Sequence, residues 1–350
     1  MKSPEAQLQQ MMEQLKARSK TEVILESGFF ALILSILFVG NFTTLLIMIL
    51  NRHMRTIPNM LVASLAVSDF GLGALCSGPL GLLAISTSDW PFNDATCQYQ
   101  GYIAITMAVA STQTLTIMAV NRYFRIVNQR KYRRFFTKKK TTIIIIVSWL
   151  YSLFTPLPYV LSGHKMIFHP SKFFCYLQVN SGPFTAFLVT VNVGIPSNVI
   201  FYCYLKIFKS VGNHSNNFQS SRHGTSRAVK VKDIKIARTL FAIVIFFTLC
   251  WTPVLLIDVV DTIRGRWSFP REAYLAYSFL ITISSALNPV IYGVMNKNFQ
   301  KEYLKILRCS HCRTQVAVEP FLVEGRSRTT TFSENSLRVR KKENLNEERM

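Results

Sequence analysis

Seven long stretches of almost uninterrupted apolar residues follow one another along the chain, separated by polar segments. An α-helix rises about 1.5 Å per residue, so each stretch can cross a hydrocarbon core of roughly 30 Å. A membrane β-barrel would need shorter segments of alternating hydrophobicity, which the sequence does not show. The pattern predicts an all-α membrane protein, a seven-transmembrane helix bundle. The stretches cover residues 29–50, 59–87, 101–120, 141–162, 182–205, 239–257 and 273–295.

Composition supports a membrane protein over a soluble one. Hydrophobic residues make up 49% of the chain and charged residues only 17%. A soluble protein of this kind would expose enough apolar surface to aggregate, which disfavours both a soluble enzyme and a soluble bundle of buried helices. The net charge is nevertheless +22, so the basic residues must be concentrated in a few segments.

Those basic residues indicate an orientation. Residues 125–140 and 206–238 are rich in Lys and Arg, whereas the connections on the opposite side, 163–181 and 258–272, carry few of them. Positively charged connections usually stay in the cytoplasm. We therefore expect a multi-pass protein of the plasma membrane with its N-terminus outside and its C-terminus cytoplasmic. The N-terminal residues show no apolar core followed by a cleavage site, so no removable signal peptide is expected.

Asp69 is the one carboxylate within these stretches, and they contain no Lys or Arg. A charge at membrane depth is costly, so such a residue is functional by default. A carboxylate surrounded by hydroxyls and amides suits a sodium ion or a proton, with Asp69, Ser111 and Asn288 as the candidate site. The alternative is a protonated Asp69 that only joins helices by hydrogen bonds. The polar side chains expected to face it are Asn41, Ser111, Ser284, Ser285 and Asn288.

Pro196, Pro253 and Pro289 lie within the fifth, sixth and seventh stretches and are the candidate kink positions. Proline removes a backbone hydrogen bond and permits a kink. Phe247 and Trp251 precede Pro253 on one face of the same helix. An aromatic lever beside a hinge would let that helix swing between two packings.

A basic residue marks the cytoplasmic end of the third stretch. Arg122, within Asn121-Arg122-Tyr123, needs an acceptor at that depth. Asp233 at the base of the sixth stretch and Tyr204 in the fifth are the candidates. Pairing of Arg122 with Asp233 would hold the third and sixth helices together in a resting state.

Two cysteines lie on the expected oxidising side of the membrane. Cys97 comes just before the third stretch, and Cys175 lies in the second outer connection. A disulfide between them would tie that connection over the mouth of the bundle.

Together these features resemble the rhodopsin-like (class A) G-protein-coupled receptors over about residues 27–308. The matching residues are Gly40-Asn41, Leu65-Ala66-Val67-Ser68-Asp69, Cys97 with Asn121-Arg122-Tyr123, Trp149, Pro196 with Tyr204, Phe247 with Cys250-Trp251-Thr252-Pro253, and Asn288-Pro289-Val290-Ile291-Tyr292. The resemblance implies a non-enzymatic receptor that binds an extracellular ligand and opens its cytoplasmic face to a heterotrimeric G protein. It implies a switch formed by Asn121, Arg122, Tyr123, Tyr204, Asp233, Phe247, Trp251, Pro253, Asn288, Pro289 and Tyr292.

Within that class the chain is similar to melatonin receptors and their invertebrate relatives. Asn121 replaces the commoner Asp before Arg122, and residues 291–303 look much like theirs. This implies a melatonin-like receptor with inhibitory-type coupling. Tyr159 and Asn192 stand where melatonin receptors carry a ligand-contacting Asn and His, and Gln178 is one residue from their second-loop Gln. A peptide or another small molecule is the alternative ligand.

Single residues test two further subfamilies. Thr282 stands where opsins carry their Schiff-base Lys, which excludes covalent retinal, and Ala104 stands where amine receptors carry an Asp. Asp258 and Asp261 could still attract a cation or a basic peptide, or they could be solvated residues that cap a helix end. The resemblance implies a ligand pocket formed by Ala104, Ile105, Ala108, Tyr159, Gln178, Asn192, Trp251, Leu255, Asp258, Ser278 and Thr282.

The C-terminal part carries signals for lipid and regulatory partners. Residues 296–308 are predicted to form an amphipathic helix 8 in the membrane interface. Palmitoylation of Cys309 and Cys312 would add a second anchor in membrane lipid, although this pair could also be half of a zinc site. The polar tail, 309–350, is predicted to be disordered. Phosphorylation of its Ser/Thr-rich run, 326–336, would suit arrestin.

The expected organisation is an extracellular N-terminal tail (1–26), a seven-transmembrane receptor domain (27–295), helix 8 (296–308) and a cytoplasmic tail (309–350). The competing class is a transporter or ion pathway that uses Asp69. Neither an internal repeat nor paired broken helices support that class. No cofactor other than a sodium ion, and no nucleic acid, is expected to bind.

Overall fold

The computed structural model describes residues 3–179, 181–216 and 224–315, and of these the side chains of 211–237, 240 and 307–315 lie outside the description. The chain divides into two units, Met1–Lys305 and Ile306–Met350. Residues 316–350, which include most of the predicted disordered tail and the Ser/Thr-rich run, lie outside the described residues.

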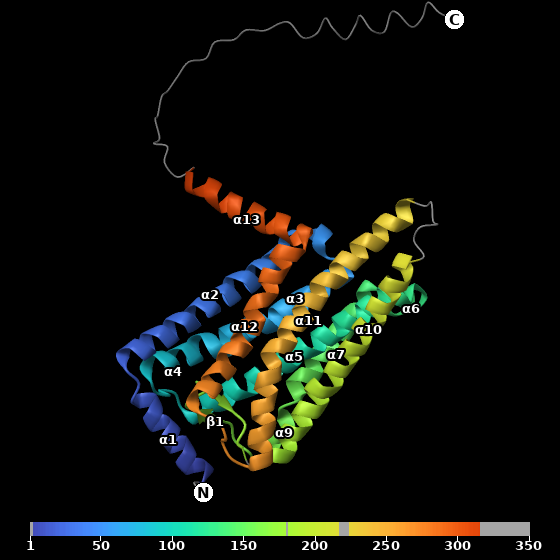
Figure 1. Ribbon diagram of the computed structural model, residues 1–350. Coiled ribbons are helices and arrows are strands. Elements are labelled where there is room, and N and C mark those ends of the chain that lie inside the picture. The colour runs from blue at the N-terminus through green and yellow to red at the C-terminus, as the bar shows by residue number, and fades with distance from the viewer. Residues whose placement is uncertain (1–2, 180, 217–223, 316–350) are drawn as a thin grey trace, which may run out of the picture. The chain divides into compact units, whose positions relative to one another are not determined.

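Seven helices among the described residues are long and apolar enough to span a membrane, which confirms the prediction; their arrangement can be followed in Figure 1. Most of the helices extend past the predicted apolar stretches, because polar residues continue them beyond the hydrocarbon region. The spans are Lys20–Leu50 (α2), Ile57–Thr87, Asp94–Val127 (α5), Lys138–Leu161, Gly182–Ser210, Phe241–Arg264 and Arg271–Met295 (α12).

Three spans consist of consecutive pieces, and the sixth is the second part of a longer helix, α11 (Gly224–Arg264). The pieces are α3 (Ile57–Leu72), η2 (Gly73–Gly81) and α4 (Leu82–Thr87), then α7 (Lys138–Phe154) and α8 (Leu157–Leu161), then α9 (Gly182–Val189), η3 (Thr190–Gly194) and α10 (Ile195–Asn216). The remaining elements are α1 (Pro4–Lys16), η1 (Arg52–Met54), α6 (Gln129–Phe135), strands β1 (Ile167–His169) and β2 (Phe174–Tyr176), and α13 (Lys297–Gln315).

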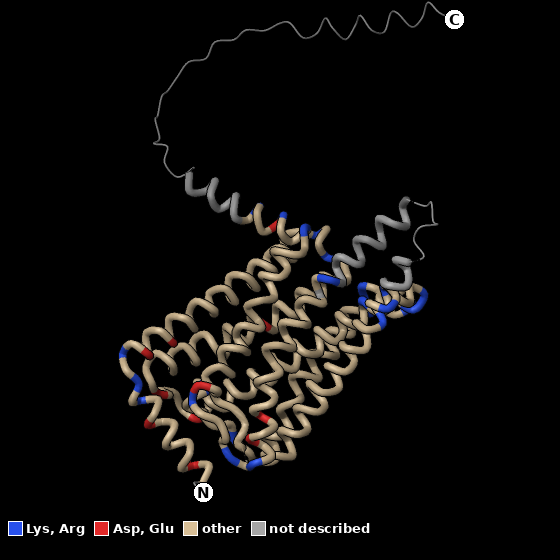
Figure 2. The backbone as a smooth tube through the Cα atoms, in the orientation of Figure 1, with Lys and Arg blue, Asp and Glu red and all other residues tan. Residues whose placement is uncertain are grey.

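The central helix of the bundle is α5. It contacts α3, α7, α10 and α11, while α2 packs on α3 and α12, and α12 packs on α11. Buried residues run along α5 from Cys97 to Arg122. At the periphery, Ile146 and Val147 on α7 are more than half exposed, as lipid-facing side chains should be. Figure 2 shows Lys and Arg gathered around α6, at the end of the bundle away from the β-hairpin.

Two of the three prolines do not interrupt their helices. Both α11 and α12 continue through Pro253 and Pro289 without a break. Wider π-helical turns occur instead at η2, which contains Pro79, and at η3, just before Pro196. In η2 a Cβ on Gly78 would lie 2.6 Å from a backbone carbonyl oxygen, so this turn requires glycine.

The N-terminal segment is a docked helix. Leu15 of α1 is 1% exposed and packs in the apolar core. The Gln7 side chain exchanges two hydrogen bonds with the backbone of Trp267, at 3.0 and 3.2 Å. Glu26, near the start of α2, bonds Arg18 and Arg271, each at 2.6 Å. These contacts hold α1 over the hairpin end of the bundle.

Candidate functional site

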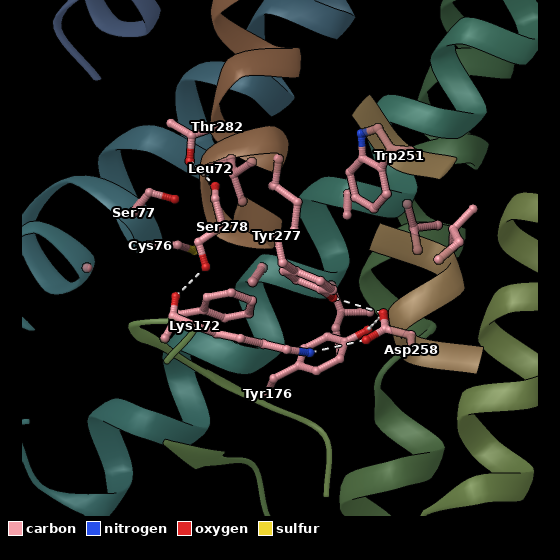
Figure 3. Close-up of a pocket in the computed structure, with 18 of the residues that line it drawn as sticks. Leu72, Cys76, Ser77, Lys172, Tyr176, Trp251, Asp258, Tyr277, Ser278 and Thr282 are labelled. Carbon is pink, nitrogen blue, oxygen red and sulfur yellow. Dashed lines mark hydrogen bonds and ion pairs between the residues drawn. The ribbon is translucent and has the colours of Figure 1, made fainter. Parts of the chain in front are cut away.

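A mainly apolar cavity of about 980 Å³, counting its open mouth, lies inside the hairpin end of the bundle. Side chains of η2, α5, α11 and α12 form its wall together with residues of the β-hairpin (Figure 3). Nine of the eleven predicted pocket residues line it: Ala104, Ile105, Ala108, Asn192, Trp251, Leu255, Asp258, Ser278 and Thr282.

Tyr159 and Gln178 are not among the residues that line this cavity. The Tyr159 side chain is fully buried, and its hydroxyl donates to the Lys165 carbonyl at 3.0 Å. The same hydroxyl accepts from the Gln178 backbone N–H at 3.1 Å. These hydrogen bonds tie α8 to the second outer connection, and neither residue lines the cavity wall.

The wall includes the predicted aromatic lever. Trp251 lines the cavity and stacks on Phe247, with ring centroids 5.3 Å apart. Its indole Nε1 donates to Ser284 Oγ on α12 at 3.1 Å. A molecule that fills the cavity would therefore contact a side chain that links α11 to α12.

Sequence reasoning included Asp258 in the wall but missed its charged partner, Lys172. Lys172 in the hairpin turn points its Nζ at Asp258 Oδ1, 3.2 Å away, with side-chain exposures of 0% and 6%. Tyr176 and Tyr277 donate their hydroxyls to Asp258 Oδ2 at 3.1 and 2.9 Å, and Figure 3 draws these bonds. Asp258 is thus not a solvated cap. Burial and the negative charge of Asp258 raise the pKa of Tyr176 well above its ordinary value, so its hydroxyl stays protonated.

Asp261 has a different role from Asp258. It is 3% exposed, accepts the Tyr274 hydroxyl at 2.8 Å and accepts the Ser268 backbone N–H at 2.8 Å. These bonds fix the connection between α11 and α12, so Asp261 is also not a solvated cap.

The predicted disulfide is confirmed. Cys97 at the start of α5 is bonded to Cys175 in β2, with their Cα atoms 5.4 Å apart. Strands β1 and β2 pair in antiparallel fashion, with Phe168 opposite Cys175. The bond therefore anchors the hairpin whose turn carries Lys172.

The polar cluster predicted around Asp69 is present within the bundle. Asp69 is 1% exposed, and its Oδ1 accepts from Ser111 Oγ at 3.4 Å and Ser285 Oγ at 2.9 Å. Its Oδ2 accepts from the Asn288 amide nitrogen at 2.6 Å. Asn41 does not bond Asp69 directly. It donates to the Ser285 carbonyl at 3.2 Å and so helps to position Ser285.

The remaining switch residues lie toward the α6 end. Arg122 is 1% exposed and lines a second cavity of about 1950 Å³, counting open space, together with several basic side chains. The buried Tyr204 hydroxyl has no hydrogen-bond partner among the described residues, so it is not the acceptor for Arg122. Asp233 belongs to α11, but its side chain lies outside the described residues. The predicted pairing of Arg122 with Asp233 stays a prediction.

Other switch residues pack between helices. The Tyr123 and Tyr202 rings lie 6.2 Å apart between α5 and α10. Tyr292 stacks on Phe299 of α13, with centroids 5.5 Å apart. Pro289 packs so closely on α2 that a Cβ on Gly40 would lie 2.4 Å from its ring, which explains why glycine occupies that position.

Comparison with known proteins identifies the class. The family described as "7 transmembrane receptor (rhodopsin family)" matches residues 40–292. Melatonin receptor type 1B of Mus musculus is 29% identical over 294 residues, 79% of each chain, and melatonin receptor type 1A of the same species is 28% identical over 287 residues, 79% of this chain and 78% of that protein. Squid rhodopsin superposes with a TM-score of 0.71 at 18% identity, over 87% of this chain and 93% of that one.

The chain belongs to the rhodopsin family of seven-transmembrane receptors. It is a multi-pass membrane protein, with seven spans in the part of the chain that the structure describes, and is a receptor rather than an enzyme. Family membership implies a ligand and a G protein as partners.

Proposed function

We propose that this receptor resides in the plasma membrane, binds an extracellular ligand in the hairpin-end cavity and then opens its α6 end to a heterotrimeric G protein. The observation that carries the proposal is the position of Trp251, which lines the cavity and also contacts Phe247 and Ser284. A ligand can change the packing of α11 on α12 only if it binds one of two arrangements more tightly. Contact with Trp251 gives it the means to do so.

The α6 end supplies a suitable surface for the cytoplasmic partner. The cavity there is lined by Arg122 and by the basic side chains of η1, α5 and α7. We infer that Arg122 contacts the G protein once α11 moves outward, and that Asp233 restrains Arg122 until then. Asn121, Tyr123, Tyr204 and Tyr292 would repack during the same movement.

A sodium ion fits the chemistry of the Asp69 cluster. The hydroxyl oxygens of Ser111 and Ser285 lie within hydrogen-bond distance of the Asp69 carboxylate, and oxygen ligands are those that hard cations prefer. Asn288 presents its amide nitrogen to Asp69, so it would position the carboxylate rather than hold the ion. A bound ion would compensate the buried charge of Asp69 and favour the resting packing.

The ligand itself is inferred only as a class. The mouse relatives are melatonin receptors, which supports a small molecule of melatonin-like size. Inhibitory-type coupling is proposed on the resemblance of the sequence to melatonin receptors. Asn192 lines the cavity and accepts a hydrogen bond from Tyr151 at 2.9 Å, so it is one polar group that a ligand could meet. Tyr159 and Gln178 support the second connection instead, and another small molecule or a peptide is the second candidate.

Lipid and arrestin are proposed as further partners. Phe299 on α13 is fully buried, and the beginning of this helix is amphipathic in sequence, which suits a position along a membrane surface. Cys309 and Cys312, whose side chains lie outside the described residues, would carry the lipid chains. Arrestin would bind after phosphorylation of residues 326–336, which also lie outside the described residues.

The test is nucleotide exchange on purified G protein by the receptor in lipid nanodiscs, with a small-molecule library as the source of ligands. An active compound should lose its effect in Trp251→Ala. Phe246→Ala is the matched control, because Phe246 lies on the same helix but is 43% exposed. Loss of the response in both variants, or in neither, would argue against a specific role of Trp251 in transmitting ligand binding. Flux of a solute through vesicles that contain the receptor, without any exchange activity, would favour the transporter class.

A further inference from the structure

We propose that Lys172 is a built-in occupant of an ammonium-binding site, which closes the cavity to organic cations and leaves it selective for uncharged ligands. This inference rests on one part of the proposed function, namely that the hairpin-end cavity is the ligand site. Lys172 lies three residues before the disulfide-bonded Cys175, in a polar connection where a lysine would ordinarily be solvated.

The site has the chemistry of an ammonium receptor. Asp258 supplies the negative charge 3.2 Å from Lys172 Nζ. Aromatic rings surround the same nitrogen: their centroids lie 3.9 Å away for Tyr277, 4.7 Å for Tyr176, 5.5 Å for Tyr274 and 5.6 Å for Trp267. Aromatic faces attract cations through their quadrupole, most strongly where water is excluded. An acidic group inside an aromatic cage therefore binds ammonium ions, here one from the chain itself.

The conformation of the hairpin turn places the Lys172 side chain in this site. The backbone N–H groups of Lys172 and Phe173 both donate to the His169 carbonyl at 3.0 Å, and Ser278 Oγ donates to the Lys172 carbonyl. Phe173 adopts a φ of +59°, which bulky residues rarely accept unless surrounding contacts enforce it. The side chain of Phe173 is 3% exposed, so packing holds this conformation.

The neighbouring histidine adds no second cation. His169 is fully buried, against the rings of Trp267 and Tyr274 at 4.5 and 4.6 Å. Burial and the adjacent charge of Lys172 lower the pKa of His169 well below its ordinary value. Among the described residues, the groups around the Lys172 ammonium are thus two carboxylates, Asp258 and Asp261, and neutral rings. Asp261 is already bonded to the Tyr274 hydroxyl and to the backbone of the α11–α12 connection.

The consequence is a filter for ligand charge. Lys172 and Asp258 compensate each other, so a charged ligand would have to break this pair or be buried without a partner, and both are costly. An uncharged ligand can use the apolar wall without disturbing it. Lys172 is therefore a specificity-determining residue, and its removal should expose Asp258 and the cage to an external ammonium.

The experiment measures binding of n-butylammonium, which carries the four-carbon chain and the ammonium group of a complete lysine side chain, to purified receptor in nanodiscs by calorimetry and by thermal unfolding. Lys172→Ala should bind it at least roughly tenfold more tightly than the wild type and should show a saturable rise in Tm. Lys172→Met is the matched control, because it loses the charge but still fills the space, so it should not gain this affinity. The double variant Lys172→Ala with Asp258→Asn should not bind, and n-butanol, an uncharged probe of similar size, should not bind Lys172→Ala.

Equal affinity of the wild type and Lys172→Ala for n-butylammonium, or retained binding in the double variant, would overturn the proposal. If Lys172→Ala alone does not fold, addition of n-butylammonium during expression should restore its surface level, and failure of this rescue would also overturn it. The readouts involve no G protein. A receptor that fails to signal but shows this pattern would contradict the proposed function and leave the ammonium site standing.

Discussion

Two buried carboxylates in this bundle are compensated in different ways. Asp258, near the hairpin end, faces the ammonium of Lys172 and accepts two tyrosine hydroxyls. Asp69, deeper in the bundle, accepts hydrogen bonds from three uncharged side chains. A buried charge is costly unless it is paired. Asp258 is therefore satisfied within the chain, whereas Asp69 needs a proton or a cation from outside it.

This difference predicts a structural role for Asp258 and a regulatory role for Asp69. The Lys172–Asp258 pair ties the β-hairpin to α11, so its loss should act on stability and on ligand selection. If a cation compensates Asp69, as proposed above, it would exchange with the solution, so changes there should act on the balance between resting and active packings.

The largest expected effect comes from Asp258→Ala. Removal of one partner of a buried ion pair leaves the other charge uncompensated and costs about 3–5 kcal/mol, so the thermal unfolding midpoint in nanodiscs should fall sharply. Addition of Lys172→Met to this variant should restore much of the loss. Asp89→Ala is the control, because Asp89 pairs with Lys16 at the surface with side-chain exposures of 50% and 57%. Equal effects of Asp258→Ala and Asp89→Ala would show that the buried pair is not structural.

The second effect concerns the anchor of the hairpin. Cys97→Ala should lower the free energy of unfolding by about 2–5 kcal/mol and reduce surface expression, with Cys175→Ala behaving alike. Any sodium sensitivity of the purified variant should persist, because the Asp69 cluster does not include the hairpin. Cys203→Ala, which removes a buried free thiol, controls for the lost side chain. A wild-type free energy of unfolding and wild-type surface expression in both disulfide variants would show that the disulfide does not anchor the hairpin.

Much of the fold and part of the site could be predicted from the sequence. Long apolar stretches specify membrane helices directly, and Asp69 was identifiable because a lone carboxylate contrasts with its apolar surroundings. Lys172 was not identifiable, since a lysine in a polar connection looks solvated until the hairpin is known to fold inward. The hydrogen bonds of the Tyr159 hydroxyl to the second outer connection could not be predicted from the sequence, because they depend on how that connection folds back. The docking of α1 depends on Gln7 and Leu15 meeting distant residues, which helical pattern alone does not reveal.

A smaller effect is expected at Asp69. If Na⁺ favours the resting packing, replacement of K⁺ by Na⁺ at constant ionic strength should lower basal nucleotide exchange by about three- to tenfold, which corresponds to roughly 0.7–1.4 kcal/mol. Asp69→Asn should abolish this dependence, because the amide carries no charge for the ion to compensate. Persistence of the sodium effect in Asp69→Asn would place the ion elsewhere.

The smallest effect is expected at the α6 end. An ion pair between Arg122 and Asp233 that is partly solvated contributes about 0–1 kcal/mol, so Asp233→Ala should raise basal exchange by about two- to fivefold. Arg122→Ala should instead blunt coupling, because this side chain is proposed to contact the G protein. Unchanged basal activity of Asp233→Ala at normal surface levels would contradict the proposed restraint.

The most direct test of the receptor mechanism is a distance measurement between spin labels at Val127, at the end of α5, and Arg238, on α11. Both side chains are exposed, so labels should not disturb the core, and Cys309 and Cys312 would be replaced to avoid extra labelling. Addition of an active ligand with G protein should lengthen this distance, and Trp251→Ala should prevent the change. An unchanged distance while nucleotide exchange rises would contradict outward movement of α11 as the step that opens the α6 end.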